Sequence, residues 1–407
     1  MMNAMSLADL ADPAVLPDPY PVLAELREAS PFARLDGAFV VAGRHADCSA
    51  VLRDPSASSE RDRSLLASAA QRPARGRPSF LSLDPPDHTR LRRLVAKAFT
   101  PRTIARLEPR IRAITKDLLT AARAAGQQLE VVGQLAYPLP VRIISELLGV
   151  PVEDHGKFAG WSARLAHSVQ PVLGLDQEQA TAQVEAARQA SDEFAAYFAD
   201  LIAARRAHPA RDLLSGLIRA EDDGAKLSQD ELIATCVLLL VAGHETTVGL
   251  ISNAILALLR HPDQLAMLRA DPGLAAAAVE ETLRYDAPVQ MTSRVARGRM
   301  QVGDISVPDG AMVLLLLAAT GRDPEVFPDP DRFDIRRGAT GHLAFAAGPH
   351  FCLGAPLARL EATIALRAFA SSVVEPELDP HGLHYKPNFN LRGPDQLIVH
   401  FAAMQAA

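Results

Sequence analysis

The sequence predicts a mainly α-helical fold with small β-sheets at its periphery. Apolar residues recur at helical spacing along most of the 407-residue chain, whereas strict alternation is confined to a few short segments. The longest helical segment opens with Ser228 and Glu231, which form a capping box, and stops at His261 and Pro262. It spans about 32 residues, or roughly 48 Å. Because it is also apolar, we expect it to be buried through the middle of the molecule.

The remaining elements follow from the same patterns in chain order. Helical spacing predicts helices over residues 20–29, 86–98, 101–125, 137–148, 153–168, 177–206, 212–220, 262–270 and 274–285. Residues 32–41 alternate around Asp36-Gly37, a dipeptide typical of hairpins. Residues 300–307 and 311–317 are predicted to pair as strands across Asp309-Gly310, and residues 376–401 to form short C-terminal strands. Pro-rich segments such as 323–332 are expected to be loops.

Composition and charge exclude several classes of protein. Hydrophobic residues make up 48% of the chain and charged residues 22%, as in ordinary globular proteins. The formal net charge of −6 gives no reason to expect a nucleic acid partner. Three widely spaced cysteines do not form a disulfide framework, which favours a reducing compartment. There is no signal-peptide pattern, and apolar runs such as 237–243 and 312–320 are too short to span a bilayer. We therefore expect a cytoplasmic protein without membrane contact.

A cysteine near the C-terminal end of the chain has unusual neighbours. Gly348 and Gly354 bracket Cys352, and a helix follows directly, with Pro356 in its first turn. At a helix N-terminus the macrodipole and free backbone N–H groups lower the pKa of a thiol and hold a thiolate. A lone cysteine is more often a small core residue. The glycines and the helix start favour a thiolate that faces a flat partner.

The same stretch carries a family resemblance. Phe345, Gly348, His350, Cys352 and Gly354 stand at the positions of the haem-binding signature Phe-x-x-Gly-x-His-x-Cys-x-Gly, and the stretch resembles the cysteine loop of bacterial cytochromes P450. The resemblance implies that Cys352 is the thiolate ligand of the iron of haem b. It also implies one triangular, mostly helical domain over residues 1–407, with residues 1–17 as a loose N-terminal segment. Ala346 departs from the pattern, since many members have glycine there, which leaves the turn geometry open.

A polar segment interrupts the long apolar helix. It reads Ala242-Gly243-His244-Glu245-Thr246-Thr247, and polar side chains inside a buried helix are costly without partners. A threonine hydroxyl competes for the carbonyl four residues back, and Gly243 weakens the helix, so we expect a local opening. A solvent-facing polar notch is the alternative. The segment resembles the oxygen-activation motif of the same family. This implies that Ala242 and Gly243 contact haem, Thr246 hydrogen-bonds the bound dioxygen and Glu245 assists proton entry.

Two further sets of charged residues match family positions. Glu281 and Arg284 resemble the structural Glu-x-x-Arg motif, with Arg332 as the candidate third member, although such pairs are usually weak surface contacts. Haem carries two propionates, which need cations. The candidates that match family positions are His88, Arg92, Arg294 and His350. Each alone reads as a solvated basic residue, and together they favour a propionate clamp.

The resemblance also implies a reaction and its partners. One atom of dioxygen enters a C–H or C=C bond, with electrons that come from NAD(P)H through a reductase and a ferredoxin. Arg90, Arg93, Lys97 and Arg359 are candidates for steering an acidic ferredoxin to the cysteine side, although a solvated helix face is nearly as good an interpretation. We expect a monomer. We also expect a bulky, apolar, non-planar substrate, because aromatic residues are only 5% of the chain and the candidate pocket residues are mostly aliphatic. Family layout suggests a pocket formed by Leu239, Val241, Val289, Gln290, Met291, Phe389 and Asn390, with lid segments at 61–80 and 161–175.

Other functions remain open at this point. A peroxygenase or an oxidative-coupling enzyme would share the cysteine loop, and the substrate could be tethered to a carrier protein. A haem-binding sensor without turnover would share it as well. Glu245 and Thr246 favour a monooxygenase, because a sensor needs no proton relay and peroxide-using relatives tend to replace this pair.

Overall fold

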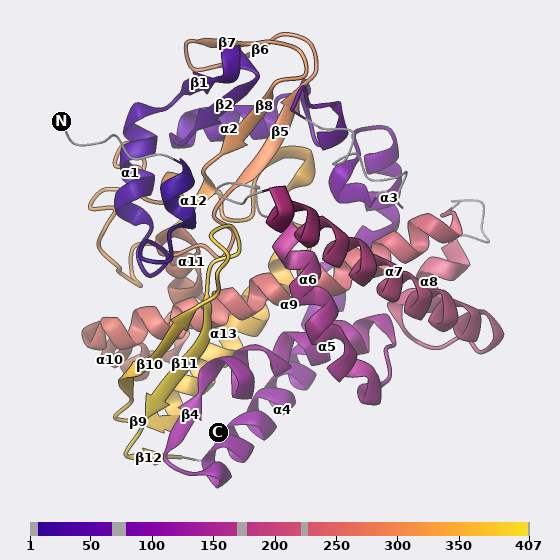
Figure 1. The fold of residues 1–407 in the computed structure, drawn as a ribbon. Helices are drawn as coiled ribbons and strands as arrows, with labels where there is room; N and C mark the ends of the chain where they lie inside the picture. The colour runs from indigo at the N-terminus through magenta and orange to yellow at the C-terminus, as the bar shows by residue number, and fades with distance from the viewer. Residues whose placement is uncertain (1–6, 67–78, 169–176, 221–226, 406–407) are drawn as a thin grey trace.

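The computed structural model describes residues 7–66, 79–168, 177–220 and 227–405 of the chain. Helices dominate it (Figure 1). They are α1 (Tyr20–Ala29), α2 (His45–Arg53), α3 (Asp87–Ala96), α4 (Pro101–Ala125), α5 (Pro138–Leu148), α6 (Phe158–Ser168), α7 (Gln177–Ala207), α8 (Leu213–Ala220), α9 (Gln229–Arg260), α10 (Pro262–Ala270), α11 (Ala275–Tyr285), α12 (Leu317–Thr320) and α13 (Ala355–Ser372). The predicted mainly helical fold is confirmed.

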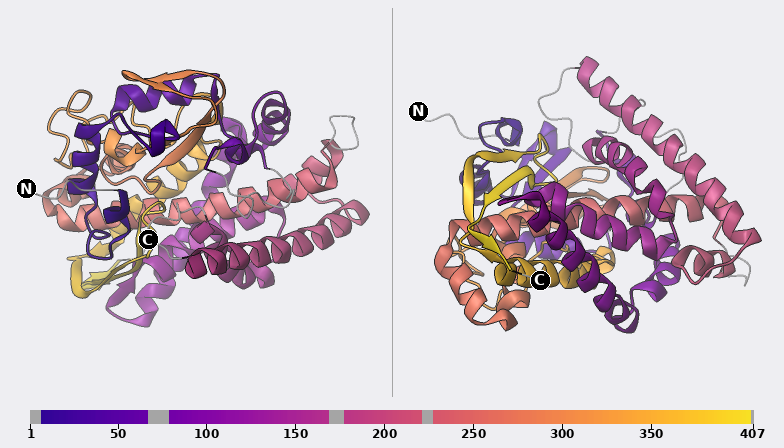
Figure 2. Two further views of the ribbon diagram at one scale, coloured as in Figure 1. Left: turned by 45° about the horizontal axis from the view of Figure 1, so that its top comes forward. Right: turned by 90° about the horizontal axis from the view of Figure 1, so that it is seen from below.

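Helix α9 crosses the whole molecule and forms the centre of the largest hydrophobic cluster (Figures 1 and 2). Its predicted capping box is present, since the Ser228 side chain accepts from the backbone N–H of Glu231 and the Glu231 carboxylate accepts from that of Ser228. Helices α5, α7, α11 and α13 pack against it. By length and composition α9 could cross a membrane, but 61% of its most apolar window is buried inside the protein. It is therefore the core helix that its sequence predicts.

The larger sheet corrects one predicted strand pairing. Its order is β1-β2-β8-β5-β3, built from β1 (Phe32–Arg34), β2 (Phe39–Ala42), β3 (Ala57–Ser58), β5 (Thr292–Ala296) and β8 (Met312–Leu315). The hairpin of β1 and β2 is confirmed. The predicted pairing of 300–307 with 311–317 is wrong. Residues 300–307 close their own hairpin, β6 (Met300–Val302) with β7 (Ile305–Val307), because Gly303 takes a positive φ of 53° at the turn. Strand β8 is instead a central strand between β2 and β5.

A second sheet, of the C-terminal strands, lies on the opposite side of α9 from the larger sheet (Figure 1). It joins β10 (Glu377–Tyr385), β11 (Pro394–His400) and β4 (Gln128–Glu130). A short pair links β9 (Val373–Val374) to β12 (Ala403–Met404). The predicted C-terminal strands are therefore present. The loop between β10 and β11 returns toward the middle of the molecule, where it approaches α9.

Candidate functional site

The cysteine loop packs tightly against helix α2. The backbone N–H of Cys352 donates to the carbonyl of Phe345 at 3.0 Å, which closes the loop before α13 begins at Ala355. Gly348 has a φ of +68°, and a Cβ there would lie 2.2 Å from the carbonyl oxygen of Leu52. Only glycine allows this approach. Ala346, the departure from the family pattern, keeps the turn by adopting a positive φ of 56°, a conformation that costs an L-residue about 1–2 kcal/mol.

The thiol of Cys352 is controlled by opposing effects. Burial raises its pKa, while the backbone N–H groups of Gly354 and Ala355 and the charges of Arg92 and Arg359 lower it. The predicted lowering of the pKa by backbone donors at the helix N-terminus is present, but burial outweighs it and the net direction is upward. The helix begins three residues after Cys352, and burial outweighs the backbone donors. A thiolate at this position needs a bound metal ion, which deprotonates a coordinating thiol outright.

The polar segment of α9 keeps its helical geometry. Thr246 Oγ1 donates to the carbonyl of Ala242 at 2.9 Å and Thr247 Oγ1 donates to that of Gly243 at 3.2 Å. The predicted competition for carbonyls is present, but the predicted opening is not, since α9 is one continuous helix. Gly243 serves helix packing, because a Cβ there would lie 3.0 Å from Ile144 of α5. Ala242 is exposed, so only a methyl group covers the helix backbone there.

Glu245 is held by two neighbours that sequence reasoning missed. Its Oε2 lies 2.8 Å from Nζ of Lys386, and its Oε1 lies 3.5 Å from Nε2 of His244. Burial alone would raise the pKa of Glu245, but His244 and Lys386 together lower it to about 2. Glu245 is therefore a carboxylate across the range in which proteins work. His244 was visible inside the motif, whereas Lys386 is 141 residues away and carries no local signal.

The residues of the predicted propionate clamp converge, and they are cationic or buried without partners. The rings of His88 and His350 lie 4.1 Å apart between centroids. Both ring nitrogens of His88 are buried and have no hydrogen-bond partner in the part of the chain that the structure describes. Arg294 donates to two neutral oxygens, the hydroxyl of Thr292 and the carbonyl of Ser293, and Arg92 donates to the carbonyl of Phe351. Among the described residues, none of these four forms an ion pair with a carboxylate.

The electrostatics of this cluster show that it lacks negative charge. Burial, with the charge of Arg294 and His88, lowers the pKa of His350 to about 3, and burial together with Arg61 lowers that of Arg294 to about 10. Asp84 is an acid whose charge acts on His350 and Arg294, but its carboxylate accepts from the hydroxyl of Ser58 and the backbone N–H of Ser59 and lies 3.9 Å from Arg297. A dianionic ligand would complete the cluster. Haem, with two propionates and an iron for the buried thiol of Cys352, fits this donor set.

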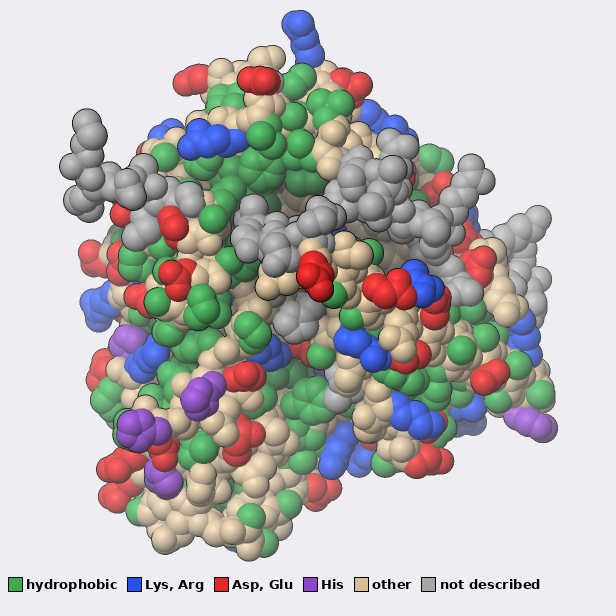
Figure 3. All heavy atoms as spheres, in the orientation of Figure 1, with side chains coloured by type: hydrophobic (Ala, Val, Ile, Leu, Met, Phe, Trp, Pro, Cys, Tyr) green, Lys and Arg blue, Asp and Glu red, His purple; other side chains and the backbone are tan. Residues whose placement is uncertain are grey.

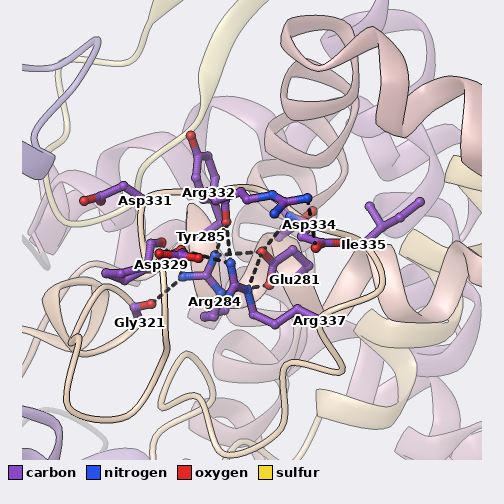
Figure 4. Close-up of polar contacts among 12 residues, drawn as sticks. Glu281, Arg284, Tyr285, Gly321, Asp329, Asp331, Arg332, Asp334, Ile335 and Arg337 are labelled. Atoms are coloured by element: carbon purple, nitrogen blue, oxygen red, sulfur yellow. Dashed lines mark hydrogen bonds and ion pairs between the residues drawn. The ribbon is translucent and has the colours of Figure 1, made fainter.

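The Glu-x-x-Arg motif is a buried network, with one correction to its membership (Figure 4). Arg284 donates from Nε and Nη2 to Glu281 at 2.8 and 2.7 Å, and both side chains are buried. The third member of this network, and the second basic side chain on Glu281, is Arg337 at 3.1 Å and not Arg332. Arg332 offers only its backbone carbonyl to Arg284, while its side chain is 66% exposed near Asp334. A turn from Asp334 to Arg337 brings the later arginine back to Glu281.

The predicted pocket residues do not all meet. Backbone contacts join Gln290 to Asn390 at 2.9 Å and Val289 to Leu391, so these two segments lie side by side. Met291 and Phe389 pack into the cluster around α1, whereas Leu239 belongs to the cluster around α9. Leu239 and half-buried Val241 are thus the apolar residues beside the polar segment. The expected lid at 61–80 falls mostly, and that at 161–175 partly, outside the described residues.

The face around the cysteine loop is only partly basic. Arg90 pairs with Glu231 and Asp87, and Arg359 donates to Glu280 at 2.6 and 2.9 Å, so their charges are neutralised locally. Arg93 and Lys97 are exposed on the α3 side. Phe351, next to Cys352, is 41% exposed. The face of the molecule in Figure 3 mixes both signs of charge, as the composition predicts.

Comparisons with known proteins agree with this site. A family model described as cytochrome P450 matches residues 35–272 and 273–371. Vitamin D(3) 25-hydroxylase of Pseudonocardia autotrophica is 42% identical over 368 residues, covering 89% of this chain and 87% of the relative. The 6-deoxyerythronolide B hydroxylase of Saccharopolyspora erythraea is 38% identical over 411 residues, covering 97% and 98%. The ligand-free crystal structure of Mycobacterium smegmatis CYP164A2 has a TM-score of 0.91 and 48% identity, covering 97% of this chain and 99% of that one.

Proposed function

We propose that this chain, which belongs to the cytochrome P450 family and is a monooxygenase, takes its electrons from a ferredoxin and oxygenates a bulky apolar molecule. Haem b ligated by a cysteine thiolate supplies the reductive activation of dioxygen when it is bound. Cys352 would hold the iron, and His88, Arg92, Arg294 and His350 would hold the propionates. The observation that carries this assignment is the buried, unpartnered His88 in a cluster of cations beside the cysteine loop.

The residues of α9 have separable roles in this proposal. Thr246 carries a hydroxyl proton, which it donates to the carbonyl of Ala242 in this structure. Glu245 is ionised at rest, so its carboxylate acts as an acceptor that holds a proton only in passing. Leu239 and Val241 flank them with apolar surface that excludes water. We therefore assign proton transfer to Glu245 and Thr246. A reconstituted assay under ¹⁸O₂ tests the reaction: one labelled atom is expected in the product, and label taken only from water would contradict it.

A large apolar substrate is supported by the relatives and by the apolar side chains of Leu239 and Val241 beside the polar segment. The two hydroxylases are named for vitamin D3 and 6-deoxyerythronolide B, a secosteroid and a macrolide ring, both large and mostly apolar. We propose a substrate of that kind, such as a polyketide macrolide, terpenoid or steroid. A binding screen by the haem Soret shift distinguishes the possibilities. Shifts with macrolides or steroids support the proposal, and shifts only with small planar aromatics contradict it.

Exposed basic residues support electron entry on the cysteine side. Arg93 and Lys97 are exposed on α3 and the turn after it, and Arg92 ties α3 to the cysteine loop through the carbonyl of Phe351. We propose that an acidic ferredoxin docks there and that the protein works as a cytoplasmic, membrane-free monomer. Reduction by ferredoxin should slow with added salt and in R93A/K97A. A rate that is insensitive to both would contradict this docking face.

A peroxygenase is the alternative enzyme, and one experiment separates it. Both Glu245 and Thr246 are present and face polar partners, which favours the ferredoxin-dependent reaction. Peroxide alone is therefore expected to support slow, poorly coupled turnover. Rapid, coupled turnover with peroxide and without ferredoxin would establish the alternative.

A further inference from the structure

Glu245 belongs to a group of side chains that connects the core helix to the surface. His244 is 1% exposed and Glu245 11%, whereas Lys386 is 26% exposed. The Glu245 carboxylate stands between the other two side chains. Its Oε1 faces His244 and its Oε2 contacts the Lys386 ammonium. Lys386 is thus the member of the group that reaches the outside. The order of burial gives the group an inner and an outer end.

Lys386 comes from the loop between β10 and β11, which lies over α9. Together with Pro19, Tyr385 and Phe389 it lines a shallow surface depression beside the N-terminal segment. Its contact with Glu245 links two segments 141 residues apart. Glu245 does not line the depression itself, so Lys386 is the residue that contacts both the depression and the carboxylate of α9.

The inner end of the group is fixed by α9 itself. Nδ1 of His244 lies 2.7 Å from the carbonyl of Leu240 and donates to it, while Nε2 faces Glu245 at 3.5 Å and stabilises that carboxylate only when the imidazole is protonated. The Tyr137 ring stands edge-on to the imidazole, with centroids 5.8 Å apart. Burial and the charge of Glu245 raise the pKa of Tyr137 to about 12, so it stays neutral. The charged or titratable groups that face Glu245 in the described residues are therefore His244, Lys386 and Tyr137.

The energetic role of Lys386 follows from the burial of Glu245. A buried carboxylate without a cation takes up a proton, because desolvation penalises the charged form. With Lys386 in place, the carboxylate keeps its charge and its direction. Thr246, the next residue, has its hydroxyl committed to the carbonyl of Ala242 and makes no hydrogen bond to Glu245. Glu245 is therefore held toward the loop rather than toward Thr246.

We propose that Lys386 is a positioning residue for Glu245 and holds its carboxylate at the inner end of a proton path that begins at the depression beside the β10–β11 loop. The inference rests on the proposed function, since it assumes that Glu245 takes part in proton transfer. For each proton that Glu245 releases inward, its carboxylate takes up one from water at the depression. The Lys386 ammonium keeps its own proton, so the ion pair separates for this uptake and re-forms afterwards.

The test uses the holoenzyme and four variants. K386M removes the cation, K386R keeps it, and K116M removes an exposed lysine of α4 as a charge-matched control. The protonated-carboxyl infrared band of Glu245, identified by its loss in E245Q, is followed against pH. In K386M the pH at which the band appears should rise by roughly one to three units, with K386R and K116M unchanged. Product formed per NAD(P)H should fall in K386M and be restored in K386R.

A double variant shows whether the effect runs through Glu245. In an E245Q background, K386M should cause no further loss of coupling, because the pair is already broken. It also removes both charges of the ion pair together and leaves no buried carboxylate without its cation, so it keeps the fold even where K386M alone is unstable. An unchanged band and coupling in K386M, or equal losses with and without Glu245, would overturn the role of Lys386 alone. An E245Q enzyme that stays fully coupled would instead overturn the proposed relay, and this inference with it.

Discussion

Replacing Arg337 is expected to destabilise the protein far more than replacing Arg332, although Arg332 is the residue that sequence reasoning favoured. Arg337 donates to the fully buried Glu281 at 3.1 Å and to the carbonyls of Asp329 and Arg332 at 3.0 and 2.9 Å. Hydrogen bonds to a charged group contribute about 1.5–3 kcal/mol each. Arg284 still neutralises Glu281 in the variant, so we expect R337A to cost about 2–3 kcal/mol.

The matched change at Arg332 gives the contrast. Its side chain is mostly exposed and lies 3.6 Å from Asp334, and a surface pair of this kind contributes about 0–1 kcal/mol. Both variants would be compared with the wild type by urea titration followed by far-UV circular dichroism, with haem retention measured in parallel. R337A should unfold at clearly lower urea and release haem earlier, because this network anchors the segment that leads to the cysteine loop. Equal losses in R337A and R332A would refute the assignment.

Four further substitutions test the site from different sides. A346G should stabilise the holoprotein by about 0.5–1 kcal/mol in a thermal melt, since glycine relieves the strain of a positive φ. G348A should sharply lower the haem content of the purified protein, because its Cβ would clash with the carbonyl of Leu52. The ion pairs of Glu280 with His342 and Arg359 outweigh the effect of burial and lower its pKa to about 2. Its contribution to the stability of the fold is therefore present above pH ~4.5 and is lost as the pH falls toward 2. E280Q should therefore destabilise the protein at neutral pH and make acid unfolding less steep; identical acid titrations would contradict this. H88L should raise the rate of haem transfer to apomyoglobin about tenfold or more, because it removes a buried side chain that would bind a propionate. The control variant R93L should transfer haem at the wild-type rate.

Most helices could be predicted because their signals are local. The capping box at Ser228 and the glycine after α5 mark helix ends within the sequence itself, and α4 was bounded correctly at both ends. Helix α2 was missed, since only Cys48, Val51 and Leu52 of it are buried and they make a weak stripe. The pairing of β8 with β2 could not be predicted, because the two strands are more than 250 residues apart in the chain. The pairing of β8 with the nearby β5 carried no turn signal of its own, since a separate hairpin stands between the two strands.

The site divides in the same way. Cys352, His350 and Thr246 lie in contiguous motifs, so their identities were readable from spacing. Partners that meet only in three dimensions were not: Lys386 reaches Glu245 from a distant loop, and Arg337 reaches Glu281 after a turn. The sign of the pKa shift at Cys352 also required the structure, because it depends on how burial compares with two backbone donors.

The ligation of haem iron by Cys352 is tested most directly by the spectrum of the reduced protein with carbon monoxide. The wild type is expected to show the red-shifted Soret band that is diagnostic of a thiolate ligand, and C352S should lose that band while the buried C48S variant keeps it. A red-shifted band that persists in C352S, or a wild-type band at the position of a histidine-ligated haem, would contradict the account.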